Sequence, residues 1–342
     1  MFAQPNTIGV KIAFFEIEGW EEKPIKERFA ESYLSGERLN EENLPADNSF
    51  EIISVFGNSR VTEKVIAHFP NLKFLTTRST GFDHVDVGAA EKRGISVASV
   101  PGYGDNTVAE FAFGLILNLT RKIYAAIDRL KEGGDFWFDG LRGTDLKGKT
   151  LGVIGTGRIG KEVIKIAGGF GMKVIATDIY EDKKAAEDMG FKYVSLEELL
   201  KTSDIITIHC PYMKETHHLI NKGNINLIKK GAYLVNTARG GIVETDALVE
   251  ALNKGILAGA GLDVLEEEVE LKEETVFLKE KPTSEELRTV LSDHILMKMP
   301  NVLITPHTAF NSQEAVERIL ETTLQNIEGF LAGKPVNIVR PQ

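Results

Sequence analysis

Short apolar runs separated by amphipathic stretches dominate the first hundred residues. The runs are rich in β-branched and aromatic residues and fall at residues 10–17, 52–56, 74–77 and 95–100. Runs of this length that alternate with helical patterns are typical of βαβ units, in which helices connect parallel strands. We therefore expect a parallel sheet covered by helices in the N-terminal third of the chain.

A longer helical pattern leads into a second series of strands. Apolar residues recur at helical spacing over residues 107–131, after a plausible cap at Asn106 and before Gly133-Gly134, which predicts one helix that connects two domains. The strands predicted after it occupy residues 151–154, 173–176, 205–208, 233–235, 258–262 and 302–304. A glutamate-rich stretch at 266–281 interrupts this series and is expected to be a solvated loop. The pattern predicts an α/β protein with two doubly wound parallel-sheet domains, the second at 103–304.

Composition and charge favour an enzyme that acts on small molecules. The chain has 342 residues, more than one hydrophobic core usually organises, and a formal net charge of −10 with basic residues interspersed among acidic ones. This distribution argues against nucleic acid or a membrane surface as a partner. Cys210 is the only cysteine, the apolar N-terminal stretch lacks a cleavage pattern, and no apolar run reaches the roughly 20 residues of a membrane helix. We expect a cytoplasmic location.

A glycine-rich turn carries the first chemical signal. The strand predicted at 151–154 is followed directly by the hexapeptide Gly155-Thr156-Gly157-Arg158-Ile159-Gly160, and a helical pattern begins within it. The first glycine permits a tight turn, the second lets backbone amides approach a pyrophosphate, and the third allows close helix packing. Asp178 ends the next strand, 18 residues after Gly160, where a carboxylate accepts hydrogen bonds from ribose hydroxyls and repels a 2′-phosphate. The turn predicts a dinucleotide site, and Asp178 favours NAD over NADP.

Reactive side chains follow three of the later strands, at the sheet edge where open parallel sheets bind their ligands. Arg239 lies in segment 236–241, Asp263 ends segment 261–263, and His307 ends segment 305–307. Together with the motifs Arg78-Ser79-Thr80-Gly81-Phe82-Asp83, Val100-Pro101-Gly102-Tyr103 and Ala109-Glu110, they stand in the order seen in one family. Over nearly its whole length the chain resembles the D-isomer-specific 2-hydroxyacid dehydrogenases, which include D-lactate and phosphoglycerate dehydrogenases.

The resemblance implies three catalytic residues. Arg239 matches the arginine that binds the substrate carboxylate and polarises its carbonyl group, a task suited to a planar guanidinium. His307 matches the general acid and base, which gives a proton to the carbonyl oxygen as hydride arrives. Glu268 matches the carboxylate that pairs with this histidine and favours its protonated form. Because the chain reads Glu266-Glu267-Glu268, an error of one or two residues in this assignment stays open.

The resemblance also implies how cofactor and substrate are bound. Asp263 would hold the nicotinamide carboxamide, although an aspartate after a strand also often caps a turn. The dinucleotide would further contact the glycine turn, Asp178, His209, Cys210, Pro211, Thr216, Thr237, Ala238, Arg239 and His307. The substrate would contact Arg239, the backbone of Ser79, Thr80 and Gly81, and the rings of Tyr103 and Phe310, each of which could equally be core packing. No metal site is expected, and the adjacent His217-His218 pair does not suggest one.

The family architecture implies that the first domain is discontinuous. A flavodoxin-like substrate domain would comprise residues 1–102 and 305–342, and a Rossmann-type NAD domain residues 103–304. A homodimer through the NAD domain is implied as well, with the arm at Phe136-Trp137-Phe138 reaching the partner, although this trio could also cap its own core.

The substrate is expected to be a small 2-keto acid that carries no phosphate. Residues 76–87 offer Arg78 alone to neutralise a phosphate, and the spacing from Glu268 to His307 is long, as in lactate dehydrogenases. The chain ends soon after the last helix, so no appended regulatory domain is expected. These features favour reversible reduction of pyruvate to D-lactate, with hydroxypyruvate, glyoxylate and branched 2-keto acids as alternatives.

Two other activities remain as rivals. Transcriptional corepressors of similar fold keep the cofactor site and much of the catalytic set, so an NAD(H)-sensing binding protein is the alternative from another class. The acidic chain disfavours it. Formate oxidation is disfavoured because relatives with that activity carry a glutamine where Glu268 stands.

Overall fold

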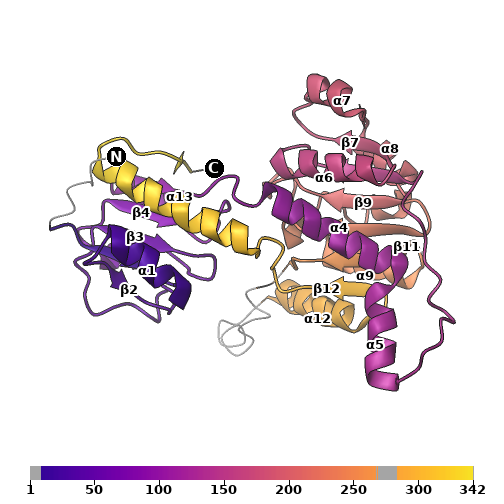
Figure 1. Ribbon diagram of the computed structural model, residues 1–342, viewed down its shortest axis with the longest axis horizontal. Helices are drawn as coiled ribbons and strands as arrows, with labels where there is room; N and C mark the ends of the chain where they lie inside the picture. Colours follow the sequence, from indigo (N-terminus) through magenta and orange to yellow (C-terminus); the bar gives the residue numbers. More distant parts are fainter. Residues whose placement is uncertain (1–8, 267, 269–282, 342) are drawn as a thin grey trace. The chain divides into compact units, whose positions relative to one another are not determined.

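The apolar runs of the chain form the strands of two separate sheets. The computed structural model describes residues 9–266, 268 and 283–341 (Figure 1). The chain divides into two units, Met1–Tyr103 with Ser312–Gln342, and Gly104–Asn311. Each unit has one mainly parallel sheet, which confirms the α/β class with two doubly wound domains. Apart from Glu266 and Glu268, the stretch 266–281 that was expected to be a solvated loop lies outside the described residues.

The sheet of the first unit has six strands in the order β13-β5-β4-β3-β1-β2, and only β13 runs antiparallel to its neighbour. The short edge strands β2 and β13 were not predicted, because two residues give no readable apolar pattern. The strands are β1 (Ile12–Phe14), β2 (Tyr33–Leu34), β3 (Ile52–Val55), β4 (Phe74–Thr77), β5 (Ser96–Ala98) and β13 (Ile338–Val339). The helices are α1 (Gly19–Arg28), α2 (Glu63–His68), α3 (Val87–Lys92) and α13 (Gln313–Leu331).

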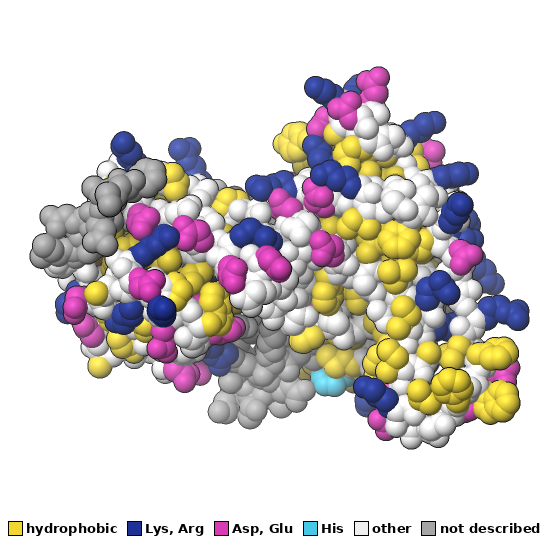
Figure 2. All heavy atoms as spheres, in the orientation of Figure 1, with side chains coloured by type: hydrophobic (Ala, Val, Ile, Leu, Met, Phe, Trp, Pro, Cys, Tyr) yellow, Lys and Arg dark blue, Asp and Glu magenta, His cyan; other side chains and the backbone are white. Residues whose placement is uncertain are grey.

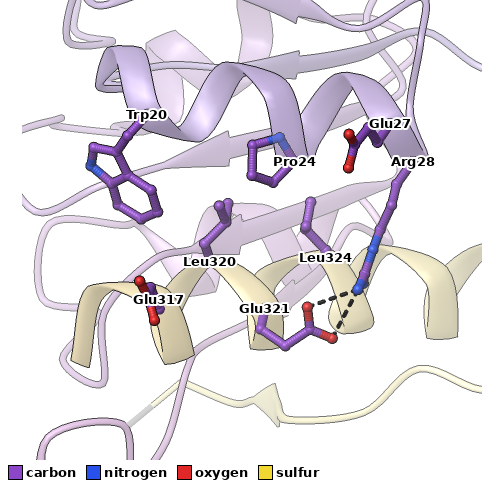
Figure 3. Close-up of a pocket in the computed structure, with 8 residues that line it drawn as sticks. All are labelled: Trp20, Pro24, Glu27, Arg28, Glu317, Leu320, Glu321 and Leu324. Atoms are coloured by element: carbon purple, nitrogen blue, oxygen red, sulfur yellow. Dashed lines mark hydrogen bonds and ion pairs between the residues drawn. The ribbon is translucent and has the colours of Figure 1, made fainter. Parts of the chain in front are cut away.

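Alternate residues of these strands build a core on each face of the sheet. On one face, Phe14 and Phe74 pack with Leu324 of α13, and on the other, Ile53 packs with Ile66 of α2. Figure 3 shows α1 and α13 side by side. A pocket of about 350 Å³ lies between these helices, and two of the residues that line it, Arg28 and Glu321, form an ion pair of 2.7 Å. The last long helix of the chain therefore completes the core of the first unit.

The second unit has a seven-stranded, fully parallel sheet in the order β12-β11-β10-β9-β6-β7-β8. Its strands are β6 (Thr150–Ile154), β7 (Lys173–Thr177), β8 (Lys192–Tyr193), β9 (Ile205–Ile208), β10 (Ala232–Asn236), β11 (Leu257–Leu262) and β12 (Val302–Ile304). The helices described are α4 (Asp105–Arg121), α5 (Ile123–Gly133), α6 (Arg158–Gly169), α7 (Lys183–Met189), α8 (Leu196–Thr202), α9 (Thr245–Asn253) and α12 (Ser284–Lys298), with 3₁₀ turns η1 (Ile225–Leu227) and η2 (Gly240–Ile242).

The single helix predicted over residues 107–131 is two helices. Lys122 between α4 and α5 has the left-handed φ of 52°, which ends the helical hydrogen bonding there. The first of these helices, α4, follows directly where the chain enters the second unit, and it packs into that unit. Leu115 lies so close to Gly261 of β11 that a side chain at this glycine would be only 3.1 Å from the leucine Cβ. This packing sets the position of β11 and of the residue that follows it.

The chain leaves the second unit later than the predicted residue 305. Beyond β12, the backbone amide of His307 still donates to Asp263 at 2.9 Å, which fastens this segment to the second unit. The return occurs at Ser312, whose hydroxyl caps α13. His307 therefore belongs to the same unit as Arg239. Within the described part of the chain, no helix is long and apolar enough to cross a membrane.

Candidate active site

Two of the three glycines in the glycine-rich turn are required by close contacts, and the third faces open space. Gly155 has a φ of +91°, and a side chain there would lie 2.5 Å from the backbone nitrogen of Cys210. A side chain at Gly160 would collide with the carbonyl oxygen of Gly155, so the helix α6 can approach β6 only with glycine here. A Cβ at Gly157 would contact nothing within 4 Å. The turn is therefore packed on its inner side and accessible at Gly157, next to the N-terminus of α6.

Asp178, which follows β7, is bound to this turn. Its Oδ2 accepts from the backbone nitrogen of Thr156 at 2.6 Å and from the threonine hydroxyl at 3.1 Å, and its Oδ1 accepts from Tyr180 N at 3.0 Å. The Tyr193 hydroxyl lies 2.7 Å from the same threonine hydroxyl. Sequence reasoning missed Tyr193, because nothing distinguishes a tyrosine on a two-residue edge strand. These contacts fix the carboxylate beside the glycine turn.

Two buried polar atoms in the loops after β9 and β10 lack a partner within the described chain. His209 bonds through Nε2 to the Thr207 hydroxyl at 2.8 Å, and burial lowers the pKa of His209 to about 3, so the ring is neutral and its buried Nδ1 is unsatisfied. The hydroxyl of Thr237 is also buried without a partner among these residues. Such atoms cost roughly 1 to 3 kcal/mol each unless something satisfies them. Together with the accessible turn, they fit a polar dinucleotide along this sheet edge.

The remaining predicted cofactor loop residues have structural contacts of their own. Burial raises the pKa of Cys210 to about 11, so its thiol stays neutral and inert. The hydroxyl of Thr216 donates to the Pro211 carbonyl at 2.8 Å and accepts from Met213 N at 2.7 Å, which closes the loop after β9. Ala238 N donates to Asn236 Oδ1 at 3.0 Å.

Asp263, directly after β11, organises the segment that carries His307. It is 1% exposed, its Oδ1 accepts from the Thr305 hydroxyl at 2.6 Å and from Thr308 N at 2.9 Å, and its Oδ2 accepts from Ala309 N at 2.8 Å. Burial raises the pKa of Asp263, and these hydrogen bonds oppose the shift. Both carboxylate oxygens hold the turn, while the predicted contact with a nicotinamide carboxamide stays a prediction.

His307 is paired with Glu268. Its Nδ1 lies 2.9 Å from Glu268 Oε2, and Glu268 Oε1 accepts from Leu265 N at 3.0 Å. The histidine has a left-handed φ of 53°, a conformation that the hydrogen bonds to Asp263 stabilise. Because the pair occupies Nδ1, proton transfer to a substrate falls to Nε2. The neighbouring Glu266 contacts His218 instead, and residue 267 lies outside the described residues.

Arg239 stands on a turn that Asn236 holds. Asn236, 1% exposed at the end of β10, donates through Nδ2 to the Arg239 carbonyl at 2.8 Å, and the guanidinium donates to the Ala238 carbonyl at 2.8 Å. A side chain at Gly240 would collide with the Leu265 carbonyl group, so the turn packs directly on the segment that leads to Glu268. Sequence reasoning did not assign Asn236 a role, although a buried amide at a strand end is a recognisable signal.

The predicted substrate-loop residues follow β4 in the first unit. Thr80 donates to the Val100 carbonyl at 2.8 Å, Ser79 donates to the Gly81 carbonyl at 2.6 Å, and Tyr103 accepts from Arg318 at 2.6 Å through its backbone oxygen. Arg239, Glu268, His307 and Phe310 belong to the second unit. The predicted residues thus form one set in each unit.

Arg78, which precedes this loop, is buried at 1% exposure. Its guanidinium pairs with Glu21 at 3.5 Å and donates to the carbonyls of Phe15 at 2.8 Å and Glu16 at 2.6 Å. The only lysine or arginine of segment 76–87 is therefore committed to the core of the first unit and does not face a ligand. Across the described ranges, no group of three or more His, Cys, Asp or Glu could hold a metal ion.

Comparisons with known proteins extend this description. Residues 113–309 match the family described as D-isomer specific 2-hydroxyacid dehydrogenase, NAD binding domain. An aromatic 2-oxoacid reductase of Clostridium sporogenes is 41% identical over 287 residues, which cover 82% of this chain and 83% of the relative. The structure of a D-lactate dehydrogenase from Aquifex aeolicus with NAD and lactic acid is 36% identical with a TM-score of 0.84, over 97% of this chain and 99% of the other. A pyruvate reductase of Chlamydomonas reinhardtii is 34% identical with a TM-score of 0.85, over 96% and 98%.

Proposed function

The chain belongs to the D-isomer-specific 2-hydroxyacid dehydrogenase family, and from that premise we propose that it reversibly reduces pyruvate, or a close homologue, to the D-2-hydroxy acid. It is an NAD-dependent oxidoreductase that acts on the CH–OH group of a 2-hydroxy acid. The observation that carries the proposal is the 2.9 Å contact between His307 Nδ1 and Glu268 Oε2, since it prepares an imidazole for proton transfer.

Each of the three side chains has one task in the proposed reaction. NADH, when bound, supplies the hydride that reaches the carbonyl carbon. The Nε2 of His307 gives its proton to the carbonyl oxygen, which becomes the hydroxyl group of the 2-hydroxy acid. Glu268 balances the positive charge of the protonated ring beforehand. Arg239 binds the substrate carboxylate through its planar donor fork and polarises the carbonyl group.

The substrate proposal excludes a phosphorylated acid. Burial of Arg78 against Glu21 leaves segment 76–87 without a lysine or arginine for a phosphate, which disfavours phosphoglycerate. The relatives named for pyruvate and D-lactate support a small side chain. The relative named for aromatic 2-oxoacids supports a second candidate, reduction of phenylpyruvate or a similar acid.

A panel of 2-keto acids tests the proposal. Pyruvate, 2-ketobutyrate, 2-ketoisocaproate, phenylpyruvate, hydroxypyruvate and glyoxylate are assayed with NADH and with NADPH, and the product is resolved on a chiral column. We expect the highest kcat/KM with pyruvate or 2-ketobutyrate and NADH, and a D-configured product. Higher kcat/KM with phenylpyruvate would select the second candidate, and preference for hydroxypyruvate or glyoxylate would overturn both. Tight NADH binding without any turnover would indicate the NAD(H)-sensing protein.

We also propose that the second unit forms a homodimer through an exposed aromatic arm. Phe136, Trp137 and Phe138 are 87%, 71% and 81% exposed, and α5 beside them has no buried residue. Figure 2 shows hydrophobic side chains gathered over this helix and the chain after it. Contiguous apolar surface of this kind is typical of protein interfaces. Light scattering should give twice the chain mass for the parent protein and a monomer for Trp137→Ser/Phe138→Ser; an unchanged mass would rule this face out. The predicted cytoplasmic location stays a prediction.

A further inference from the structure

The structure assigns a positioning role to His218: its hydrogen bond to Glu266 fastens the segment that carries Glu268 to the turn that carries Arg239. This inference rests on the proposed function, because it concerns how two of the proposed catalytic side chains keep their places. His218 and Glu266 are absent from the proposed catalytic set.

The first half of the argument concerns the turn after Arg239. His218 N donates to the Gly241 carbonyl at 2.8 Å, and Ile220 forms a parallel bridge with Val243. The turn that ends at His218 is therefore hydrogen-bonded to the residues that follow Arg239. Its side chain is three-quarters buried, at 26% exposure, so its direction is set by packing.

The second half concerns Glu266, two residues before Glu268. Its Oε1 bonds to Nε2 of His218, and its Oε2 accepts from the backbone nitrogen of Thr245 at 3.2 Å and from the threonine hydroxyl at 2.8 Å. The side chain is only 13% exposed. One carboxylate oxygen therefore binds His218 and the other binds Thr245, and together these bonds hold the backbone at residue 266.

The bonds of Glu266 lie where the segment that carries Glu268 already contacts the turn that carries Arg239. Gly240 packs on the carbonyl group of Leu265, and Leu265 N in turn donates to Glu268 at 3.0 Å. If the chain at 265–266 shifts, the contact with the Arg239 turn and the support of Glu268 both change. Because active sites lose rate when reacting groups move by a fraction of an ångström, the His218 bond should affect kcat without touching the substrate.

The variant His218→Leu tests the role, with His217→Leu as the matched control. His217 is exposed, stacks on His218 at 3.8 Å between ring centres, and contacts the Tyr212 hydroxyl, but has no described bond to Glu266. We expect His218→Leu to lower kcat with the best 2-keto acid by about 10- to 100-fold. NADH affinity, measured by fluorescence titration, should stay within about twofold, and His217→Leu should keep parental kcat.

The kinetic isotope effect distinguishes positioning from loss of folded protein. With NADH deuterated at the transferred position, slower hydride transfer in His218→Leu should raise the isotope effect on kcat above that of the parent. A smaller folded fraction would lower the apparent kcat and leave the isotope effect unchanged, which would overturn the inference. If His218→Leu does not fold, Glu266→Ala should give the same lowered kcat and raised isotope effect.

The result also separates this inference from the proposed function. Parental kcat and isotope effect in His218→Leu, combined with an inactive His307→Gln, would refute the role of His218 and leave the proposed function standing. A parent protein that turns over no 2-keto acid would overturn both.

Discussion

Nδ1 of His307 lies 2.9 Å from Oε2 of Glu268, although 39 residues separate the two in the chain. Three glutamates in succession left the partner open at the level of sequence. Tertiary contacts distinguish two of the three glutamates. Glu266 forms hydrogen bonds with His218 and Thr245, whereas Glu268 pairs with His307. The pair defines which nitrogen of the imidazole is engaged, and thereby which one is left to exchange protons with a substrate.

Loss of this pair should remove most of the reaction rate. We expect His307→Gln to lower kcat by about 10² to 10⁴, the usual contribution of a positioned acid or base, while NADH binding by fluorescence stays close to that of the parent. Glu268→Gln should lower kcat less, because its amide can still bond to the ring. Normal turnover in His307→Gln would contradict the assignment.

Asp178 should determine whether the protein binds NADH more tightly than NADPH. Asp178→Ala removes the negative charge that repels a 2′-phosphate and leaves Thr156 N without its acceptor. We expect the Kd for NADH to rise by about tenfold, since hydrogen bonds to charged groups are worth roughly 1.5 to 3 kcal/mol, while the Kd for NADPH changes less or falls. Fluorescence titration with both nucleotides measures the ratio. A parent protein that already prefers NADPH would show that this carboxylate has another purpose.

Removal of Arg78 should destabilise the protein. Arg78→Met leaves Glu21 buried at 6% exposure without its cation, and breaking such a pair costs about 3 to 5 kcal/mol. The free energy of unfolding in urea measures this loss. Lys64→Met is the control, because its ion pair with Glu41 is exposed to solvent and should contribute little to stability. Arg78→Met/Glu21→Leu should recover part of the loss; equal effects of Arg78→Met and Lys64→Met would refute the prediction.

His209 should make the cofactor-free protein less stable in acid. Burial lowers the pKa of His209 to about 3 in the folded state, while the unfolded chain binds a proton near the ordinary value of 6.5. The unfolded state then binds more protons between these values, so this histidine's contribution is complete above pH 6.5 and is lost as the pH falls. Between pH 6 and 4.5 the slope from this residue should approach about 1.4 kcal/mol per pH unit. Urea unfolding of the parent against His209→Asn isolates that slope, and identical slopes would contradict the buried neutral ring.

Sequence pattern was informative where both faces of a strand are buried. All six strands predicted in the second unit occur, and Asp178 follows β7 beside the glycine turn, because nearly continuous apolar runs leave few alternatives in a parallel sheet. The break at Lys122 was missed, since a left-handed φ at one lysine leaves no mark on the apolar spacing. β8, with two residues, was missed for lack of pattern.

Side-chain partners across the fold were harder to predict than strands. The contacts of Asp263 with residues 305–309 and of His218 with Glu266 join segments that are far apart in the chain. Local composition carries no record of such pairs. Likewise, Arg78 could be read as a candidate phosphate ligand until its burial against Glu21 was known.

The burial of Arg78 limits how this protein could acquire a new specificity. Its guanidinium already contacts three segments of the first unit, at Phe15, Ser54 and Glu21, so reorienting it toward the substrate loop would break all three contacts. An ancestor or descendant that recognises a phosphorylated acid would need an additional cation elsewhere on the loop. If the proposed substrate is correct, discrimination against phosphate would be a by-product of how the domain is held together.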